Sequence, residues 1–157
     1  MISIRPATVK DAETLSRVLC GSIRLLCGAD HKNDPTLVAN WTANKTPEQM
    51  KRWVADPKVT IVLAERNGQA AGVGCSSSDG EILLNYVIPE HRFCGVSKAI
   101  MSHLEAALAA SFVRSKLTST ETAHRFYRDA GWVDVGEPVD VFGLRGYPME
   151  KVLRRPQ

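Results

Sequence analysis

A chain of 157 residues is long enough to bury one hydrophobic core, and a content of 44% hydrophobic and 24% charged residues excludes a disordered or fibrous protein. Twenty basic and seventeen acidic side chains give a net charge of +3, which is too mild and too evenly spread to indicate nucleic acid as the main partner. We therefore expect one folded domain over residues 1–157, with no nucleic-acid partner.

Cysteine spacing and the opening residues bear on the cellular compartment. No CxxC pair occurs, and the cysteines have no metal-ligand spacing with the four histidines, so neither a zinc site nor a disulfide framework is expected. The opening "MISIRPATVKDAETL" carries charges where a secretory signal needs an unbroken apolar stretch, and no later window approaches a membrane span. We expect a cytoplasmic protein with no metal, no membrane partner and free thiols at Cys20, Cys27, Cys75 and Cys94.

The first third of the chain is predicted to form a strand and then helices. "ISIRPAT" is typical of a short strand ended by Pro6, and "TVKDAETLSRVLCGSIRLLC" repeats its apolar residues with a helical period. Thr8 is a candidate N-cap, with Asp11 three residues later. Asp34 and Thr46 each precede a proline, a pattern that predicts the starts of two further short helices.

The middle of the chain is predicted to form three antiparallel strands. "KVTIVLAERNGQAAGVGCSSSDGEILLNYVIP" contains β-branched and apolar runs. Asn67-Gly68 and Asp79-Gly80 separate these runs, and such pairs are strong hairpin signals.

The last third alternates helices and strands. Residues 95–113 return to a helical period, and "RSKLTS" follows as a short strand. A further helix is expected over residues 121–130, with Gly131 just past its end, before two last strands in "WVDVGEPV" and "GYPMEKVL". The fold class is therefore α/β (α+β), a mixed, mostly antiparallel sheet of about seven strands with about four helices. The apolar stripe of the long helix consists of Val96, Ile100, Leu104, Ala107 and Leu108.

The segment "VIPEHRFCGVSKAIMSHLEAAL" joins an apolar strand to this long helix through a turn with Gly95. A helix N-terminus exposes unpaired N–H groups and a positive partial charge, which attract phosphate where the chain lets a ligand approach. Arg92 would add a positive charge. Alternatively, Gly95 only makes a turn and Arg92 is solvated. No GxxxxGK[ST] motif occurs, and "GVGCSS" precedes no helix, so a P-loop and a Rossmann site are excluded.

The same segment resembles the acetyl-CoA motif of the GNAT acyltransferase superfamily. The family pattern is a strand ending in Val-x-Pro-x-x, then Arg/Gln-x-x-Gly-x-Gly/Ala and a long helix. Val87, Pro89, Arg92 and Gly95 fall in register, whereas Ser97 stands where the family usually has glycine or alanine.

A second block, "LTSTETAHRFYRDAGW", is similar to the family pattern Asn-x-x-Ala-x-x-Phe-Tyr-x-x-x-Gly-Phe. In this block Thr120 replaces the asparagine and Trp132 replaces the last phenylalanine. The opening "ISIRPATVKDAETL" also looks like the family's first strand and helix, so the resemblance covers nearly the whole chain. The residues that match the second block are Ala123, Phe126, Tyr127 and Gly131.

The resemblance implies acetyl-CoA as cosubstrate and assigns residues to it. The pantetheine arm would pair with main-chain groups of Tyr86 and Val87, and Thr120 is included with the cofactor-binding residues. Tyr127 corresponds to the family's general acid near the cofactor sulfur; without the resemblance it would be read as a core aromatic residue. The pyrophosphate would lie against Arg92 and the main-chain amides of Phe93, Cys94, Gly95, Val96 and Ser97.

The general base is less defined. In histone-type relatives a glutamate at the strand position of Glu81 acts as the base through water; the alternative is an exposed carboxylate at a strand end. Asp30, His31 and Glu48 are weaker alternatives, because the segment after the first strand usually forms a wall of the acceptor site in this family.

The function implied is a direct, acetyl-CoA-dependent N-acetyltransferase that acts on a primary amine of a small molecule or peptide. The alternative is a non-catalytic acetyl-CoA-binding regulatory module, which the changes at Ser97 and Thr120 make plausible. The acceptor pocket would be shaped by residues 34–55 and 137–146. The identity of the amine and the oligomeric state stay open, with a homodimer as one option.

Overall fold

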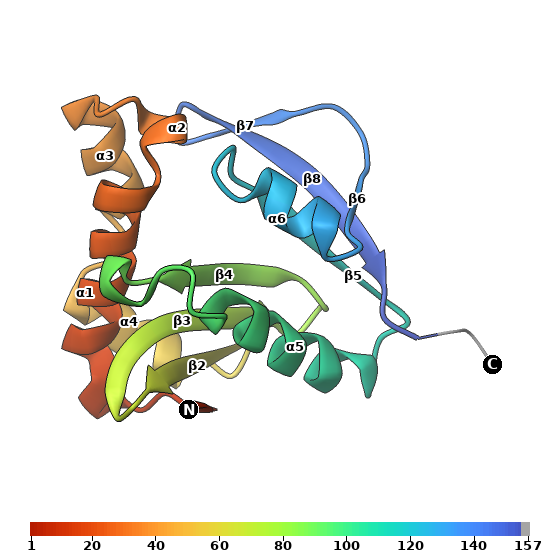
Figure 1. Cartoon of the computed structure of the whole chain (residues 1–157), viewed down its shortest axis with the longest axis horizontal. Helices are drawn as coiled ribbons and strands as arrows, with labels where there is room; N and C mark the ends of the chain where they lie inside the picture. The colour runs from red at the N-terminus through yellow and green to blue at the C-terminus, as the bar shows by residue number, and fades with distance from the viewer. Residues whose placement is uncertain (155–157) are drawn as a thin grey trace.

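The computed structural model describes residues 1–154 and contains helices and strands in the α+β arrangement expected (Figure 1). The helices are α1 (Ala12–Leu26), α2 (Gly28–His31), α3 (Pro35–Thr42), α4 (Pro47–Ala55), α5 (Val96–Ala109) and α6 (His124–Asp129), with 3₁₀ turns at Val9–Asp11 and Pro89–His91. The strands are β1 (Ile2–Pro6), β2 (Val59–Arg66), β3 (Gln69–Ser77), β4 (Ile82–Val87), β5 (Arg114–Ser119), β6 (Val133–Asp134), β7 (Val139–Val141) and β8 (Leu144–Val152).

The strands form two sheets rather than the single sheet predicted. The first has the order β1-β2-β3-β4, and the second has the order β5-β8-β6 with β7 also paired to β8. Every pairing between these strands is antiparallel. A single isolated parallel bridge, Glu81 with Lys116, joins the two sheets within the described residues, and Figure 1 shows them diverging beyond it.

Local signals placed most of the elements correctly. Thr8 and Asp11 form the expected capping box, in which the Thr8 N–H donates to Asp11 Oδ2 at 2.7 Å. Asp34 accepts from two N–H groups at the start of α3, and Thr46 accepts from the Gln49 N–H at the start of α4. Asn67 and Gly68 both have positive φ, as a tight hairpin requires.

Three elements differ from the prediction. The helix expected over residues 121–130 begins only at His124, because Asp30, a residue far away in the sequence, binds the N–H groups of Glu121 and Thr122. The stretch "WVDVGEPV" yields only the two-residue β6 and the first residue of the separate β7. The one-turn helix α2 was not predicted.

Helices pack on both faces of the first sheet and divide the core into clusters. On one face α5 contributes Val96, Ile100 and Leu104, whereas α1 and α4 pack on the other. Ala107 is exposed rather than part of the predicted stripe, and Met101 is buried on α5 instead. No helix within residues 1–154 is long and apolar enough to cross a membrane.

Glycines on β3 let α5 approach the sheet. A Cβ atom built on Gly72 would lie 2.9 Å from Ile100 Cδ1, and one on Gly74 would lie 2.5 Å from Ile100 Cγ2. Both distances are shorter than van der Waals contact, so a side chain at either position would push α5 away. Because α5 begins at the predicted phosphate turn, these glycines also set the position of that turn.

Gly74→Ala should therefore destabilise the protein. We expect the free energy of unfolding in urea to fall by about 1–3 kcal/mol, the usual cost of an overpacked core. Gly21→Ala is the matched control, because nothing lies within 4 Å of a Cβ built at this position in α1. The control should raise stability by about 0.5–1 kcal/mol. Equal effects of the two substitutions would contradict the packing argument.

Candidate functional site

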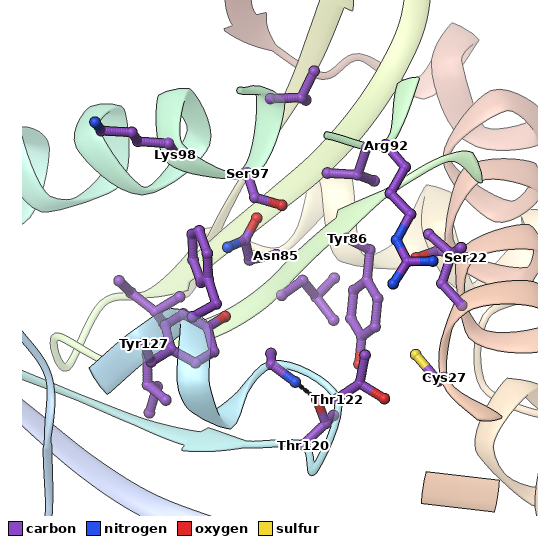
Figure 2. A pocket seen from close by; sticks show the side chains of 18 of the residues that line it. Ser22, Cys27, Asn85, Tyr86, Arg92, Ser97, Lys98, Thr120, Thr122 and Tyr127 are labelled. Atoms are coloured by element: carbon purple, nitrogen blue, oxygen red, sulfur yellow. Dashed lines mark hydrogen bonds between the residues drawn. The ribbon is translucent and has the colours of Figure 1, made fainter. Parts of the chain in front are cut away.

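The divergence of the sheets leaves one edge of β4 without a pairing partner. β4 pairs with β3 from Ile82 to Val87. On its other side, within the described residues, the only bridge to β5 is made by Glu81, the residue just before β4. A cavity of about 330 Å³ lies along this edge. Figure 2 shows side chains that line it, from β4, α1, α5, α6 and the turn before α5. The free N–H and C=O groups of such an edge are available to a ligand with amide groups.

Most of the predicted site residues line this cavity. Cys94 does not: its thiol donates to the main-chain oxygen of Arg92 at 3.5 Å, and the residue packs against the core. Glu81 lies in a neighbouring cavity instead. The predicted residues that line the first cavity are Tyr86, Val87, Arg92, Phe93, Gly95, Val96, Ser97, Thr120 and Tyr127.

The turn before α5 presents a row of unused backbone donors. Phe93 and Gly95 have φ values of 63° and 83°, so two of three successive residues adopt the left-handed conformation. Within residues 1–154, none of the N–H groups from Phe93 to Lys98 has a hydrogen-bond acceptor. Successive free amides at the N-terminus of a helix form an anion-binding nest.

Two cations stand beside these amides. Arg92 and Lys98 both line the cavity and are exposed, and neither forms a salt bridge with another described residue. The Arg92 guanidinium lies 4.5 Å from the centroid of the Phe93 ring, whose side chain is 90% exposed. The turn therefore combines positive side chains, a helix N-terminus and free amides, which together favour a phosphate group.

Tyr127 lies on α6, deep in the same cavity. Its ring packs edge-on against Phe126 and Trp132, with centroids 5.3 Å and 6.2 Å away. Gly131, with a φ of 93°, ends the helix as predicted. The chain can then turn so that the Trp132 N–H donates to the main-chain oxygen of Tyr127 at 3.0 Å. Burial raises the pKa of Tyr127 to about 12, so its hydroxyl is protonated at neutral pH.

Asn85 is a site residue that the sequence reasoning missed. It lines the cavity from β4, and Figure 2 shows it between Ser97 and Tyr127. Its Oδ1 atom is buried and has no partner among the described residues, which is unusual for a buried amide. The nearby Asn85 amide opposes the increase in the pKa of Tyr127. A polar residue within the apolar strand "ILLNYV" was the signal that could have found it.

Cys27, at the end of α1, also lines the cavity but is poorly suited to act as a nucleophile. Burial is the main reason that the pKa of its thiol rises to about 12, and a thiol rather than a thiolate is then present at neutral pH.

A second cavity of about 200 Å³ adjoins the first. Tyr86 and Thr120 line both cavities, which places them at the junction. The second cavity extends to Trp41 on α3, to Lys45 and to Phe142 in the turn between β7 and β8. The carboxylate-bearing residues Asp30 and Glu81 line it as well. This cavity includes parts of both segments that the sequence predicted for the acceptor pocket.

Asp30 connects α2 to the turn that follows β5. Its carboxylate accepts from the N–H groups of Glu121 and Thr122 at 2.7 Å and 3.0 Å, and also from the Thr122 hydroxyl. These contacts fasten the turn after β5 to α2. Both carboxylate oxygens are occupied, so Asp30 has a structural role here.

The other two weaker candidates for a base are also engaged elsewhere. The buried His31 ring contacts the Ile23 oxygen through Nε2 at 2.7 Å, and its Nδ1 accepts from the Asn33 N–H at 3.0 Å. Glu48 is exposed and pairs with Lys51 at 3.5 Å on α4. Among residues 1–154, no cluster of three or more His, Cys, Asp or Glu side chains could hold a metal ion.

Residues 29–153 match the family model described as an acetyltransferase (GNAT) domain. The chain belongs to the GNAT acetyltransferase family. The family that the two sequence motifs resemble is thereby confirmed. No curated protein matches the sequence.

Solved structures of GNAT proteins share the fold over nearly the whole chain. One is a GCN5-related N-acetyltransferase from Rhodopseudomonas palustris, 19% identical, with a TM-score of 0.85 over 96% of this chain and 94% of that one. Another is the PaiA N-acetyltransferase from Thermoplasma acidophilum in complex with coenzyme A, 18% identical, with a TM-score of 0.82 over 97% of this chain and 99% of that one. The apo form of YjaB from Escherichia coli is 20% identical, with a TM-score of 0.68 over 96% and 95% of the two chains.

The Asp30 contacts give a prediction that does not depend on activity. Asp30→Ala leaves two backbone donors without their acceptor, so we expect faster hydrogen exchange at the Glu121 and Thr122 amides and a loss of about 1–3 kcal/mol in stability. Asp129→Ala is the control, because its carboxylate is exposed and makes only a 4.0 Å contact with Arg125. Unchanged exchange at both amides in Asp30→Ala would contradict this role.

Proposed function

We propose that this GNAT protein is an acetyl-CoA-dependent N-acetyltransferase that moves an acetyl group directly to a primary amine of a small molecule or peptide. The observation that carries the proposal is the row of unpartnered amides from Phe93 to Lys98, which lies beside the unpaired edge of β4. Phosphates and an amide-bearing arm in one ligand would satisfy both features, and acetyl-CoA has both.

Residues of the turn and of β4 would hold the cosubstrate. The amides of Phe93, Cys94, Gly95, Val96 and Ser97 would bind the pyrophosphate, with Arg92 and Lys98 adding positive charge. The main-chain groups of Tyr86 and Val87 would pair with the pantetheine arm in the manner of an added strand. Thr120, at the junction of the cavities, would bound the thioester end.

Tyr127 would act as the general acid. Its phenol is protonated at neutral pH, because burial raises its pKa to about 12, and it would give this proton to the departing thiolate. The Asn85 amide would favour the phenolate that this transfer leaves behind, because its effect is to lower the pKa of Tyr127. Direct transfer needs no enzyme nucleophile, which agrees with the protonated state of Cys27.

Glu81 would act as the base through water. An alkylammonium has a pKa of about 10, so it must lose a proton before it can attack the thioester near neutral pH. Glu81 lines the second cavity and forms no salt bridge with the described residues. A relay of water molecules between Glu81 and the amine is compatible with its position at the strand end.

The double variant Arg92→Gln/Lys98→Gln tests the phosphate site. We expect the affinity for acetyl-CoA to fall by about tenfold, because ion pairs of exposed, salt-screened cations contribute roughly 0.5–1 kcal/mol each. The affinity for S-acetylpantetheine, which lacks the phosphates, should change little; both affinities are measured by calorimetry. Arg125→Gln is the control, since this arginine on α6 is 94% exposed. An equal loss of affinity for both ligands would refute the assignment.

Tyr127→Phe tests the chemistry. Thiol release from acetyl-CoA is followed across a panel of amines and peptides, and kcat should fall by a factor on the order of 10²–10⁴ with little change in acetyl-CoA affinity. Activity that survives the substitution across the pH range would eliminate Tyr127 as the acid. If the protein binds acetyl-CoA tightly but no acceptor stimulates release of the CoA thiol, the regulatory module would be favoured instead.

A further inference from the structure

Lys45 is a buried cation without a counterion. Lys45 lies between α3 and α4, is only 4% exposed, and lines the second cavity. The Nζ atom donates to the main-chain oxygen of Trp41 at 2.9 Å and to Asn44 Oδ1 at 2.7 Å, and both acceptors are neutral. No carboxylate of residues 1–154 lies within 4.0 Å of it. Buried lysines are rarely left unpaired, because burial of a lone charge is costly.

The main chain holds this cation in place. The main-chain oxygen of Lys45 accepts from the Ser16 hydroxyl at 2.6 Å and from the Cys20 thiol at 3.7 Å, and both donors lie on α1. The Lys45 N–H donates to the Thr42 oxygen at 3.0 Å. An ammonium has three N–H donors and only two are used, so a further acceptor can bind without rearrangement of the loop.

The cavity around Lys45 suits a compact ligand with one anionic end. Its volume of about 200 Å³ lies below the roughly 300–1,000 Å³ typical of pockets for drug-sized molecules. Trp41, Tyr86 and Phe142 supply aromatic walls, and the Phe142 ring centroid lies 5.8 Å from Lys45 Nζ. The other charged side chains that line the cavity are those of Asp30, Glu81 and Arg145.

We propose that the second cavity binds the amine acceptor and that Lys45 binds a carboxylate of that acceptor, so that the substrate class is a compact amino acid rather than a diamine. This inference rests on the proposed function. The amine would lie toward Tyr86 and Thr120, where the two cavities meet, and the carboxylate would lie at Lys45. A carboxylate fits better than a phosphate, because one ammonium with one free donor satisfies a monoanion. A second ammonium on the ligand would be repelled at this position.

Protonation of Lys45 provides a readout that is independent of turnover. Burial lowers the pKa of Lys45 to about 8, and the nearby Cys20 opposes part of this decrease. At pH 9 the free protein therefore carries mostly neutral Lys45. A bound carboxylate favours the charged form and raises the pKa, so binding at pH 9 should take up a proton from the buffer.

The test uses benzoate as the anion and benzamide as its neutral match, with calorimetry at pH 9 in two buffers of different ionisation enthalpy. We expect benzoate to bind with uptake of close to one proton per ligand, and benzamide to bind with none. Lys45→Met should abolish the uptake and weaken benzoate at least tenfold. Lys51→Met, an exposed lysine on α4, should behave as the wild type. Absence of benzoate binding, binding without proton uptake, or unchanged binding to Lys45→Met would each overturn the inference, and so would tighter binding of phenylphosphonate than of benzoate.

Folding of Lys45→Met is checked by its pH-dependent stability. Because the folded pKa is depressed, the native wild type binds fewer protons than the unfolded chain between about pH 8 and the usual lysine pKa, and its stability rises with pH in this window. Lys45→Met should lose this increase and be at least as stable as the wild type at pH 7.

Acetyl transfer to β-alanine, β-alaninamide and 1,4-diaminobutane then tests the substrate class. We expect the highest kcat/KM for β-alanine, with the preference over its amide lost in Lys45→Met. If no amine is acetylated, the proposed function fails, whereas the benzoate measurement still decides whether Lys45 is an anion site. Preference for the diamine or the amide would overturn the assignment of the substrate class.

Discussion

The unpaired edge of β4 is the feature on which the rest of the site depends. A sheet edge exposes N–H and C=O groups that must find partners in water or in another chain, and proteins usually protect such edges. Here the edge faces a cavity whose floor and walls are fixed by α5, α6 and the end of α1. The edge is therefore reachable by a small extended ligand but shielded from a second sheet.

Two contacts tie β5 to the rest of the molecule beside this edge. The Glu81–Lys116 bridge joins β4 to β5 at one end, and Asp30 fastens the turn after β5 at the other. Between them the strands are free to part. Because Asp30 lies on α2 and lines the second cavity, its contacts connect that cavity to the turn that leads to Tyr127.

The sequence predicted those features that depend on neighbouring residues. The caps at Thr8, Asp34 and Thr46 and the hairpin at Asn67-Gly68 each need only a few consecutive residues, and the structure contains them all. The two family motifs likewise predicted that the glycine turn and Tyr127 belong to one site, and both line the same cavity.

Features that depend on distant residues cannot be read from local patterns. Strand periodicity does not say which strands pair, and only the family resemblance indicated a free strand edge at Tyr86 and Val87. The late start of α6 follows from Asp30, whose partners lie about ninety residues away along the chain. Lys45 is ordinary in sequence, and only its burial without a carboxylate among the described residues distinguishes it. Asn85 left a weak signal as a polar residue in an apolar strand, and the structure adds its buried amide oxygen without a described partner.

The two groups of cations at the site differ in what they can do. Arg92 and Lys98 are exposed, so salt screens them and their contribution is mainly to attract and orient an anionic ligand. Lys45 is buried, so its charge is weakly screened, and no carboxylate of residues 1–154 compensates it. A buried charge of this kind penalises a ligand with the wrong charge more than it rewards the right one. Under the proposed function, affinity for the cosubstrate would come from the exposed turn, and selection of the acceptor would come from Lys45.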